Sequence, residues 1–270
     1  MFHVEHFADQ NQFMARVIAV CNQKGGVGKS TTAVNVGSYL ALSGKKTLLI
    51  DLDAQGNATT ACGIDRKNLE KDIYAVLVNG LPVTEAIRPT QIEMLSVIPA
   101  SLDLAGAEPY LTNADARETV LKKICEPLRS IYDFLIFDCP PSLGMLTVNA
   151  LVAADSTLIP VQCEYFALEG LNSLMRAVSL IKQNLNPSLR VGGIVLTMTD
   201  FRANLAKEVA EEVKHFFKDM VFDTSIPRNI RLAESPSFGK PICLYDPTST
   251  GAMAYQLLTQ EVIQKESTQP

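Results

Sequence analysis

A glycine-rich loop near the N-terminus limits the possible folds of this 270-residue chain more than any other segment does. It follows an apolar run, precedes an amphipathic segment and reads Asn22-Gln23-Lys24-Gly25-Gly26-Val27-Gly28-Lys29-Ser30-Thr31-Thr32. Glycines let such a loop turn tightly, so that successive backbone N–H groups point at phosphate oxygens. The strict pattern G-x-x-x-x-G-K-[ST] fails at Gln23, whereas the variant K-G-G-x-G-K-[ST] matches fully and adds a second lysine, Lys24. We therefore predict a phosphate-binding loop between a strand and a helix.

The loop assigns nucleotide contacts to consecutive residues. Lys29 is expected to reach the β- and γ-phosphates, and the Ser30 hydroxyl is expected to coordinate Mg²⁺. The expected nucleotide contacts in the loop are Lys24, Gly25, Gly26, Val27, Gly28, Lys29, Ser30 and Thr31. A glycine-rich turn with a solvated lysine would be the simpler interpretation, but the flanking strand and helix patterns disfavour it.

Short β-branched apolar runs alternate with amphipathic segments along the chain. The runs cover residues 17–21, 47–51, 94–99, 134–138, 157–161 and 191–197, and helical periodicity covers 31–43, 116–129, 143–153, 168–184 and 204–217. This alternation is typical of a parallel sheet with helices on both faces, in which buried strands are apolar on both sides. We predict one α/β domain with the P-loop NTPase fold, built on a mostly parallel, twisted sheet.

Acidic residues stand where two strands of this sheet are expected to end. Asp51 and Asp53 close the second run, and Asp138 closes the run 134–138. The carboxyl ends of parallel strands face the ligand crevice, so these carboxylates are expected to point toward the phosphates. An aspartate at a strand end is by itself more typical of a helix cap or a turn. Together with the phosphate loop, the three acids favour a nucleotide site.

Composition and charge exclude several classes of protein. No apolar stretch approaches the roughly 18 residues of a membrane span, and residues 1–15 lack the basic start of a secretory signal. The six cysteines lie far apart, which favours buried, reduced thiols in a cytosolic protein. The net charge of −5 argues against nucleic-acid binding by the surface as a whole. Residues 182–240, however, hold 9 basic and 7 acidic side chains, so any anion-binding surface is expected there.

Longer motifs resemble those of the deviant-Walker ATPases and, within that group, the ParA/Soj chromosome- and plasmid-partition ATPases. They are the loop with Lys24, the stretch Asp51-Leu52-Asp53-Ala54-Gln55-Gly56-Asn57-Ala58-Thr59, Phe137-Asp138-Cys139-Pro140-Pro141-Ser142, residues 160–170, residues 226–236 and Gly239-Lys240-Pro241. The resemblance spans residues 15–262. It departs at Ala54, where the family usually has proline, and this change should loosen the loop slightly. Because the segment before the phosphate loop is short, the resemblance is to the short form of the family, and we expect no helix-turn-helix domain of the larger plasmid-type members in these 270 residues.

The resemblance implies a slow, Mg²⁺-dependent ATP hydrolase that forms an ATP-sandwich homodimer. Lys24 would reach the partner subunit's phosphates, much as an arginine finger acts in trans, while Lys29 serves its own nucleotide. Asp53 would orient or activate the attacking water. Asp51 would lie beside the water shell of Mg²⁺, and Asp138 would hold Mg²⁺ through water. The implied catalytic residues are Lys24, Lys29 and Asp53, and the implied metal site is Ser30, Asp51 and Asp138.

Base and DNA recognition depend more heavily on the resemblance. Residues 197–200 read T-M-T-D where many GTPases carry T-K-x-D, and Met198 in place of the lysine favours adenine over guanine. By resemblance, Pro227 and Asn229 would border the adenine. Arg202 and Arg231 would belong to a non-specific double-stranded DNA surface that is continuous only in the dimer. Ordinary surface arginines are the alternative.

The resemblance also implies a partner and a place in the cell. A centromere-binding protein of the ParB/Spo0J type would stimulate hydrolysis together with DNA, and the protein would be cytoplasmic and nucleoid-associated. Its role would be chromosome or plasmid partition, control of replication initiation, or both. We expect residues 15–266 to form the ATPase domain, between a flexible N-terminal extension, 1–14, and a short tail, 267–270.

Other functions fit parts of the sequence. A MinD-like membrane ATPase would need a basic amphipathic C-terminal helix, whereas residues 255–270 hold one lysine and two glutamates. An iron–sulfur carrier would need paired cysteines, and Cys139 stands alone as a small apolar thiol. A protein-tyrosine kinase would need a tyrosine-rich tail, whereas residues 255–270 hold a single tyrosine, Tyr255. A generic nucleotide-binding module without a DNA role stays open.

Overall fold

A mostly parallel sheet runs through the centre of the computed structural model, which describes residues 14–67, 69–164, 166–200 and 202–268. Its strands are β1 (Arg16–Val20), β2 (Thr47–Asp51), β3 (Arg88–Pro89), β4 (Leu95–Ile98), β5 (Phe134–Asp138), β6 (Ser156–Gln162) and β7 (Arg190–Thr197). In the sheet they follow the order β3-β4-β2-β5-β1-β6-β7, and only β3 runs antiparallel to its neighbour. The predicted α/β fold is confirmed, and the phosphate loop follows the strand β1 inside the sheet.

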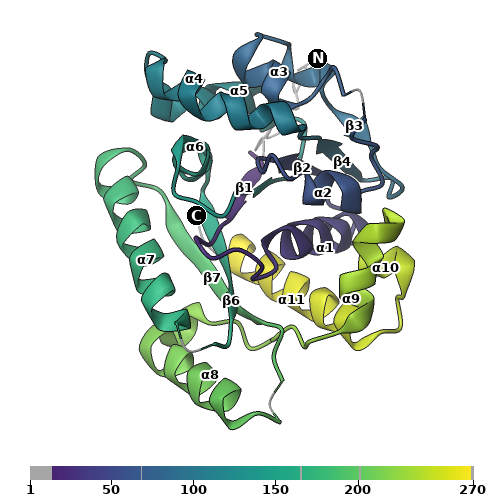
Figure 1. The fold of residues 1–270 in the computed structure, drawn as a ribbon, viewed down its shortest axis with the longest axis vertical. Coiled ribbons are helices and arrows are strands. Elements are labelled where there is room, and N and C mark those ends of the chain that lie inside the picture. Colours follow the sequence, from purple (N-terminus) through teal and green to yellow (C-terminus); the bar gives the residue numbers. More distant parts are fainter. Residues whose placement is uncertain (1–13, 68, 165, 201, 269–270) are drawn as a thin grey trace, which may run out of the picture.

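Helices cover both faces of the sheet (Figure 1). On one face lie α1 (Lys29–Leu42), α2 (Asn57–Ala61), α9 (Ile230–Glu234), α10 (Ile242–Tyr245) and α11 (Thr250–Ser267). On the other lie α3 (Ile73–Val78), α4 (Ala107–Asn113), α5 (Val120–Cys125), α6 (Met145–Ala153), α7 (Ala167–Asn184) and α8 (Asn204–Phe217). Each layer encloses its own hydrophobic core against the sheet.

Alternation along each strand divides its side chains between the two cores. In β1, Ile18 and Val20 belong to the core under α1, whereas Val17 and Ala19 belong to the core under α6 and α7. Successive side chains of a strand point to opposite faces, so a strand between two helix layers must be apolar throughout. This is why the central strands read as continuous apolar runs in the sequence.

One predicted helix differs from the structure. The segment 116–129 forms only the short helix α5, flanked by 3₁₀ turns at Arg117–Thr119 and Glu126–Leu128. Pro127 lies in the second turn. Proline has no N–H to donate to an α-helical hydrogen bond, and its ring clashes with the carbonyl four residues earlier. The apolar periodicity of the segment therefore survives, but not as one regular helix.

The C-terminal helix α11 packs beside α1, as Figure 1 shows. The hydroxyl of its buried Tyr255 lies 3.1 Å from the hydroxyl of Thr32 in α1. At its other end the buried Glu266 accepts a hydrogen bond of 2.7 Å from Ser156 and pairs with Arg190. The helix is thus part of the layer that supports the phosphate loop.

The structure bears on three further expectations. All six cysteines lie in described parts of the chain; five are buried, Cys243 is partly exposed, and none forms a disulfide, as their spacing predicts. Among the described helices, none combines the length and the apolar content needed to cross a membrane. Most of the expected extension 1–14 lies outside the described residues, which begin at Met14, and α11 reaches into the expected tail as far as Ser267.

Candidate nucleotide-binding site

The loop between β1 and α1 owes its shape to two glycines. Gly26 and Gly28 have φ angles of 74° and 90°, in the left-handed region that other residues rarely adopt. Gly28 is the N-cap of α1, and its carbonyl accepts the first helical bond, 2.8 Å from Thr32 N. The loop therefore delivers its backbone N–H groups to the N-terminus of a helix, where the helix dipole also attracts anions.

Two neighbouring strands hold this loop in place. The buried Asn22 amide donates to Pro160 O in β6 at 2.7 Å, and its oxygen accepts from Lys24 N at 3.0 Å. The Thr197 hydroxyl at the end of β7 donates to Val27 O at 2.8 Å. Since these bonds are buried or partly buried, the loop is shaped before any ligand arrives, which lowers the entropy cost of binding.

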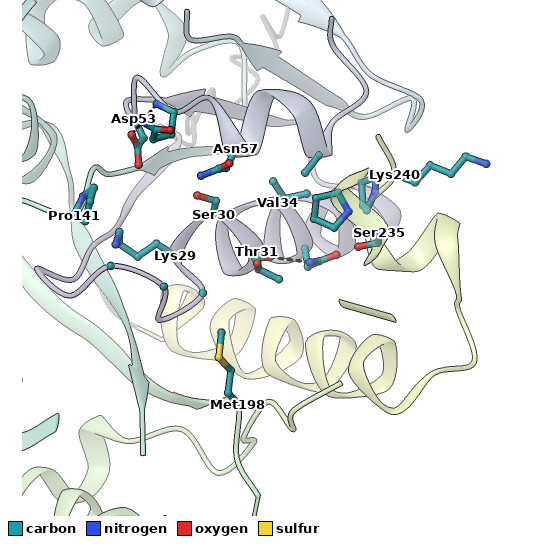
Figure 2. A pocket seen from close by; sticks show the side chains of 18 residues that line it. Lys29, Ser30, Thr31, Val34, Asp53, Asn57, Pro141, Met198, Ser235 and Lys240 are labelled. Atoms are coloured by element: carbon teal, nitrogen blue, oxygen red, sulfur yellow. Dashed lines mark hydrogen bonds between the residues drawn. The ribbon is translucent and has the colours of Figure 1, made fainter. Parts of the chain in front are cut away.

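A cavity of about 350 Å³ lies over the N-terminus of α1 (Figure 2). Figure 2 shows Lys29, Ser30 and Thr31 on the helix side, Asp53 above them and Met198 on the opposite side. Eight of the predicted contacts line the cavity: Gly25, Gly26, Gly28, Lys29, Ser30, Thr31, Asp53 and Met198. A second cavity of about 170 Å³ shares Gly28, Thr31 and Met198 with the first and is also lined by Pro227 and Asn229. The structure thus brings together the residues expected near the phosphates and those expected near the base.

Lys29 lies across its own loop. Its ammonium group donates to Lys24 O at 3.0 Å, and the residue is only 6% exposed. Burial lowers the pKa of Lys29, and the nearby carboxylates of Asp138 and Asp53 act in the opposite direction. A cation held here, close to the loop N–H groups, is placed to meet anionic oxygens entering the cavity.

Lys24 points elsewhere. Its side chain is 42% exposed and forms an ion pair with Glu164, in the segment between β6 and α7. Lys24 and Val27 do not line the large cavity, unlike the other predicted residues of the loop. The side chain of Val27 is buried beneath the loop. The two lysines of the motif therefore occupy different surroundings: Lys29 lines the cavity, whereas Lys24 lies outside it, exposed and paired with Glu164.

Asp51 and Asp138 lie next to each other at the ends of β2 and β5, in direct register, and both are fully buried. Asp51 accepts hydrogen bonds from Thr59 N at 2.8 Å, from the Thr59 hydroxyl at 2.7 Å and from Asp53 N at 3.1 Å. Burial raises the pKa of Asp51 to about 6 despite these bonds. In this structure Asp51 shapes the loop that carries Asp53, and it does not line the cavity.

Asp138 is different, because neither of its oxygens has a hydrogen-bond partner among the described residues. Burial, and then the neighbouring Asp51, raise its pKa, while Ser30 and Lys29 are close enough to oppose the shift. A buried carboxylate without donors fits a water-bound divalent cation, and the Ser30 oxygen fits its first coordination shell. In the described residues, no group of three His, Cys, Asp or Glu side chains could hold a metal alone, so a cation here would depend on ligand oxygens.

The two predicted DNA-binding arginines lie on different segments, and both are paired with acids. Arg202, just before α8, is 91% exposed and its guanidinium donates to both carboxylate oxygens of Asp200, at 2.8 and 2.7 Å. Arg231, in α9, lies 3.0 Å from Glu234 and 3.4 Å from Asp246. The sequence spacing suggested Asp200 and Glu234 as neighbours, whereas Asp246 is brought to Arg231 only by the fold.

Sequence reasoning did not assign several residues that meet at the site. Glu164 holds Lys24, and the main cavity is also lined by Val34, Asn35, Gln55, Asn57, Ala61, Pro141, Ser235, Pro236, Lys240 and Pro241. The motifs at 51–59, 160–170 and 239–241 contain several of them, so the signal was present without a role attached. Cys139 is fully buried and burial raises its pKa well above the usual value, which keeps it a protonated thiol.

A glycine-rich loop at a helix N-terminus, strand-end carboxylates and a cavity over them define a P-loop nucleotide-binding protein. A family model described as an AAA domain matches residues 15–191. The chromosome partitioning protein ParA of Myxococcus xanthus is 52% identical over 254 residues, which cover 94% of this chain and 90% of that protein. The sporulation initiation inhibitor protein Soj of Bacillus subtilis is 53% identical over 249 residues, or 92% of this chain and 98% of that one. The chain belongs to the ParA/Soj family of chromosome-partitioning ATPases.

Solved structures share the fold. Cobyrinic acid a,c-diamide synthase from Mycobacterium smegmatis, solved with a bound ATP analog and magnesium, has a TM-score of 0.82 and 35% identity, covering 94% of this chain and 96% of that one. The cell division ATPase MinD of Pyrococcus furiosus has a TM-score of 0.77 and 26% identity, with 93% and 99% coverage. The fold is therefore shared by proteins of different function, and the function must be argued from the site.

Proposed function

We propose that this protein is a slow ATP hydrolase that dimerises when it binds ATP and Mg²⁺, binds DNA without sequence preference as a dimer, and acts in partition with a ParB/Spo0J-type centromere-binding protein. One observation carries the proposal. The loop has two lysines, of which Lys29 is buried and lines the cavity, whereas Lys24 is half-exposed and does not line it. A nucleotide in the cavity would not engage Lys24, which would exchange its partner Glu164 for phosphates presented by a second subunit.

Each part of the site has a task in this proposal. The loop N–H groups and Lys29 would bind the β- and γ-phosphates, and Ser30 and Asp138 would hold Mg²⁺. The bound Mg²⁺ would neutralise charge on the phosphate oxygens. Asp53 would orient the attacking water, and its position on the cavity wall supports that role. Met198, Pro227 and Asn229 would border the adenine in the smaller cavity.

For DNA, the proposal depends on exposed guanidinium groups outside the cavity. Arg202 and Arg231 are exposed, and each would contact phosphates of the duplex backbone. The chain carries a net charge of −5, so a single subunit would bind weakly. Two copies of the basic surface in one dimer would act as linked sites and gain avidity. Such binding would place the ATP-bound dimer on the nucleoid.

Size-exclusion chromatography with light scattering tests the proposal in four arms: ADP, ATP, ATP with mixed-sequence DNA, and ATP with anionic vesicles. We expect the protein to elute as a monomer with ADP and as a dimer with ATP. In the third arm the ATP-bound dimer should co-elute with DNA, and in the fourth it should stay free of vesicles. A chain that binds ATP but stays monomeric and free of DNA would be a generic nucleotide-binding module. Recovery with vesicles instead of DNA would indicate a MinD-like membrane switch.

A further inference from the structure

The loop that carries Asp53 is a tight turn with two outward carbonyls. Gly56 N donates to Asp53 O at 2.8 Å, and Gln55 N donates to the Asp53 carboxylate at 2.9 Å. The turn is anchored toward the sheet by the bond from Asp53 N to Asp51. Gln55 is exposed and Ala54 only half-buried, so a second anchor is needed to hold the outer part of the turn.

Arg66 supplies that anchor from the segment that follows α2. Its guanidinium donates to Ala54 O at 2.7 Å and also to Gln55 O. These two bonds satisfy both outward carbonyls with one planar, forked group, which a lysine could not reproduce. The third nitrogen of the Arg66 guanidinium, Nε, is buried and its N–H has no acceptor in the described structure. Leaving this N–H unpaired costs free energy, but the same side-chain position lets the guanidinium reach both carbonyls.

Gly56 makes this close approach possible. It has a φ of 58°, and a Cβ built on it would lie 2.6 Å from Cζ of Arg66 and 2.9 Å from its Cδ. Any other residue would push the guanidinium away from the two carbonyls. Gly56 thus lets Arg66 contact the turn closely, while Asp51 holds the same turn through Asp53 N.

We propose that Arg66 is a positioning residue for ATP hydrolysis, which fixes the turn 53–56 so that the Asp53 carboxylate is held toward the cavity. The inference rests on the proposed function. Arg66 does not line the cavity itself, so it would act only through Asp53 and not by touching nucleotide. Hydrolysis is sensitive to such support, because a misplacement of about 1 Å can cost roughly 100-fold in rate.

The test compares steady-state ATP hydrolysis of Arg66→Ala and Arg66→Lys with wild type, in the full chain with DNA present. We expect kcat to fall by roughly 10- to 100-fold in Arg66→Ala, with KM for ATP within about twofold. The kcat of Arg66→Lys should lie between those of wild type and Arg66→Ala, because one ammonium group cannot satisfy both carbonyls. Lys67→Ala, which removes a neighbouring exposed charge in the same segment, is the matched control and should keep wild-type kcat.

Two further variants separate positioning from general loss of structure. Ala54→Pro in the Arg66→Ala background should restore part of kcat, because proline restricts the turn without the guanidinium and no bond from Ala54 N is lost among the described contacts. Arg66→Ala should add no further loss in the Asp53→Ala background. Wild-type kcat in Arg66→Ala, or equal losses in both backgrounds, would overturn the inference. A wild-type chain without ATP hydrolysis would instead overturn the proposed function.

Discussion

Two lysines five positions apart in the phosphate loop have different surroundings, and this difference indicates that they have different roles. Lys29 is buried, bonded to its own loop and surrounded by carboxylates. Lys24 is half-exposed and paired with Glu164. Because Lys29 lines the cavity and Lys24 does not, we expect Lys29 to neutralise the subunit's own phosphates and Lys24 to have another role.

Lys29→Ala should therefore weaken ATP binding by roughly 100-fold, because removing one partner of a buried charge pair costs about 3 kcal/mol. Lys24→Ala should keep ATP binding and lose ATP-dependent dimerisation. Fluorescent-nucleotide titration measures the first effect, and light scattering measures the second. An ATP-dependent dimer formed by Lys24→Ala would show that Lys24 does not act in trans.

The acids also differ in their expected roles. Asp53→Ala should bind ATP normally, lower turnover by roughly 100-fold and accumulate as an ATP dimer, because a water-orienting carboxylate acts mainly in the transition state. Asp138→Ala should instead weaken nucleotide binding in the presence of Mg²⁺ and leave Mg²⁺-free binding unchanged. Nucleotide affinity measured with and without Mg²⁺ separates the two variants. Unchanged turnover in Asp53→Ala would exclude it from the mechanism.

Asp51 should give the ligand-free fold a measurable pH dependence. Burial raises its pKa to about 6, above the roughly 3.9 of an unfolded chain. Between these values the folded state holds more protons than the unfolded state, so stability should fall as pH rises from about 4 to 6. Asp51→Asn should flatten this slope, whereas Asp103→Asn, on the surface, should not. Urea unfolding at three pH values between about 4 and 6 measures this pH dependence. If the stability of Asp51→Asn changed with pH as steeply as that of wild type, Asp51 would not be its source.

At the scale of elements, the C-terminal helix α11 connects the phosphate-loop helix to the far strands of the sheet. Tyr255 contacts Thr32 in α1, and Glu266 joins Ser156 in β6 to Arg190 in β7. Glu266 is 3% exposed, so its carboxylate is bonded to these protein partners and not to solvent. The helix therefore ties both ends of the site-bearing layer to the sheet.

Glu266→Ala should lower the free energy of unfolding by about 3 kcal/mol, because it leaves the half-buried Arg190 without its partner. Gln260→Ala, at an exposed position of the same helix, should change it by no more than about 0.5 kcal/mol. Urea denaturation followed by circular dichroism measures both. A Glu266→Ala variant as stable as the control would mean that the buried pair contributes nothing to the fold.

At the scale of the whole molecule, the proposed DNA binding would depend on a local basic surface, because the chain as a whole carries a net charge of −5. Arg202 and Arg231 each have acidic partners within the chain. Phosphates of DNA must compete with these acids for the guanidinium groups. Under the proposed function, a single subunit would therefore hold DNA weakly, and pairing of two subunits would supply the missing avidity.

DNA binding should require ATP, ignore sequence and weaken steeply with salt, because phosphate contacts release counterions. Arg231→Glu and Arg202→Glu should abolish DNA binding and still form the ATP-dependent dimer. Arg231→Ala should lower the slope of the logarithm of the DNA-binding constant against the logarithm of the salt concentration by about one. Glu234→Gln should tighten binding, since it frees Arg231 from a competing carboxylate. Light scattering on random-sequence DNA over a salt series measures all four. Equal binding with ATP and ADP would refute the DNA-bound switch.

Much of this protein follows from local sequence. The phosphate loop, the strand runs and the helices at 143–153, 168–184 and 204–217 are encoded by short-range periodicity and by glycine conformations, so the amino-acid sequence alone is enough to predict them. The broken helix at 116–129 was not predicted, because the effect of Pro127 was outweighed by the apolar pattern around it. The short helices on either side of the site have too few residues to show a period.

Only the tertiary structure decided which side chains meet. The pairing of β2 with β5 places Asp51 beside Asp138 although 87 positions separate them. The pairing of β1 with β6 brings Glu164 to Lys24 across 140 positions. Arg66 reaches the Asp53 turn only because α2 folds the chain back on itself. Such contacts depend on how strands are ordered and where loops return. Side-chain periodicity reports only which face of an element is buried, so it carries no information about that order.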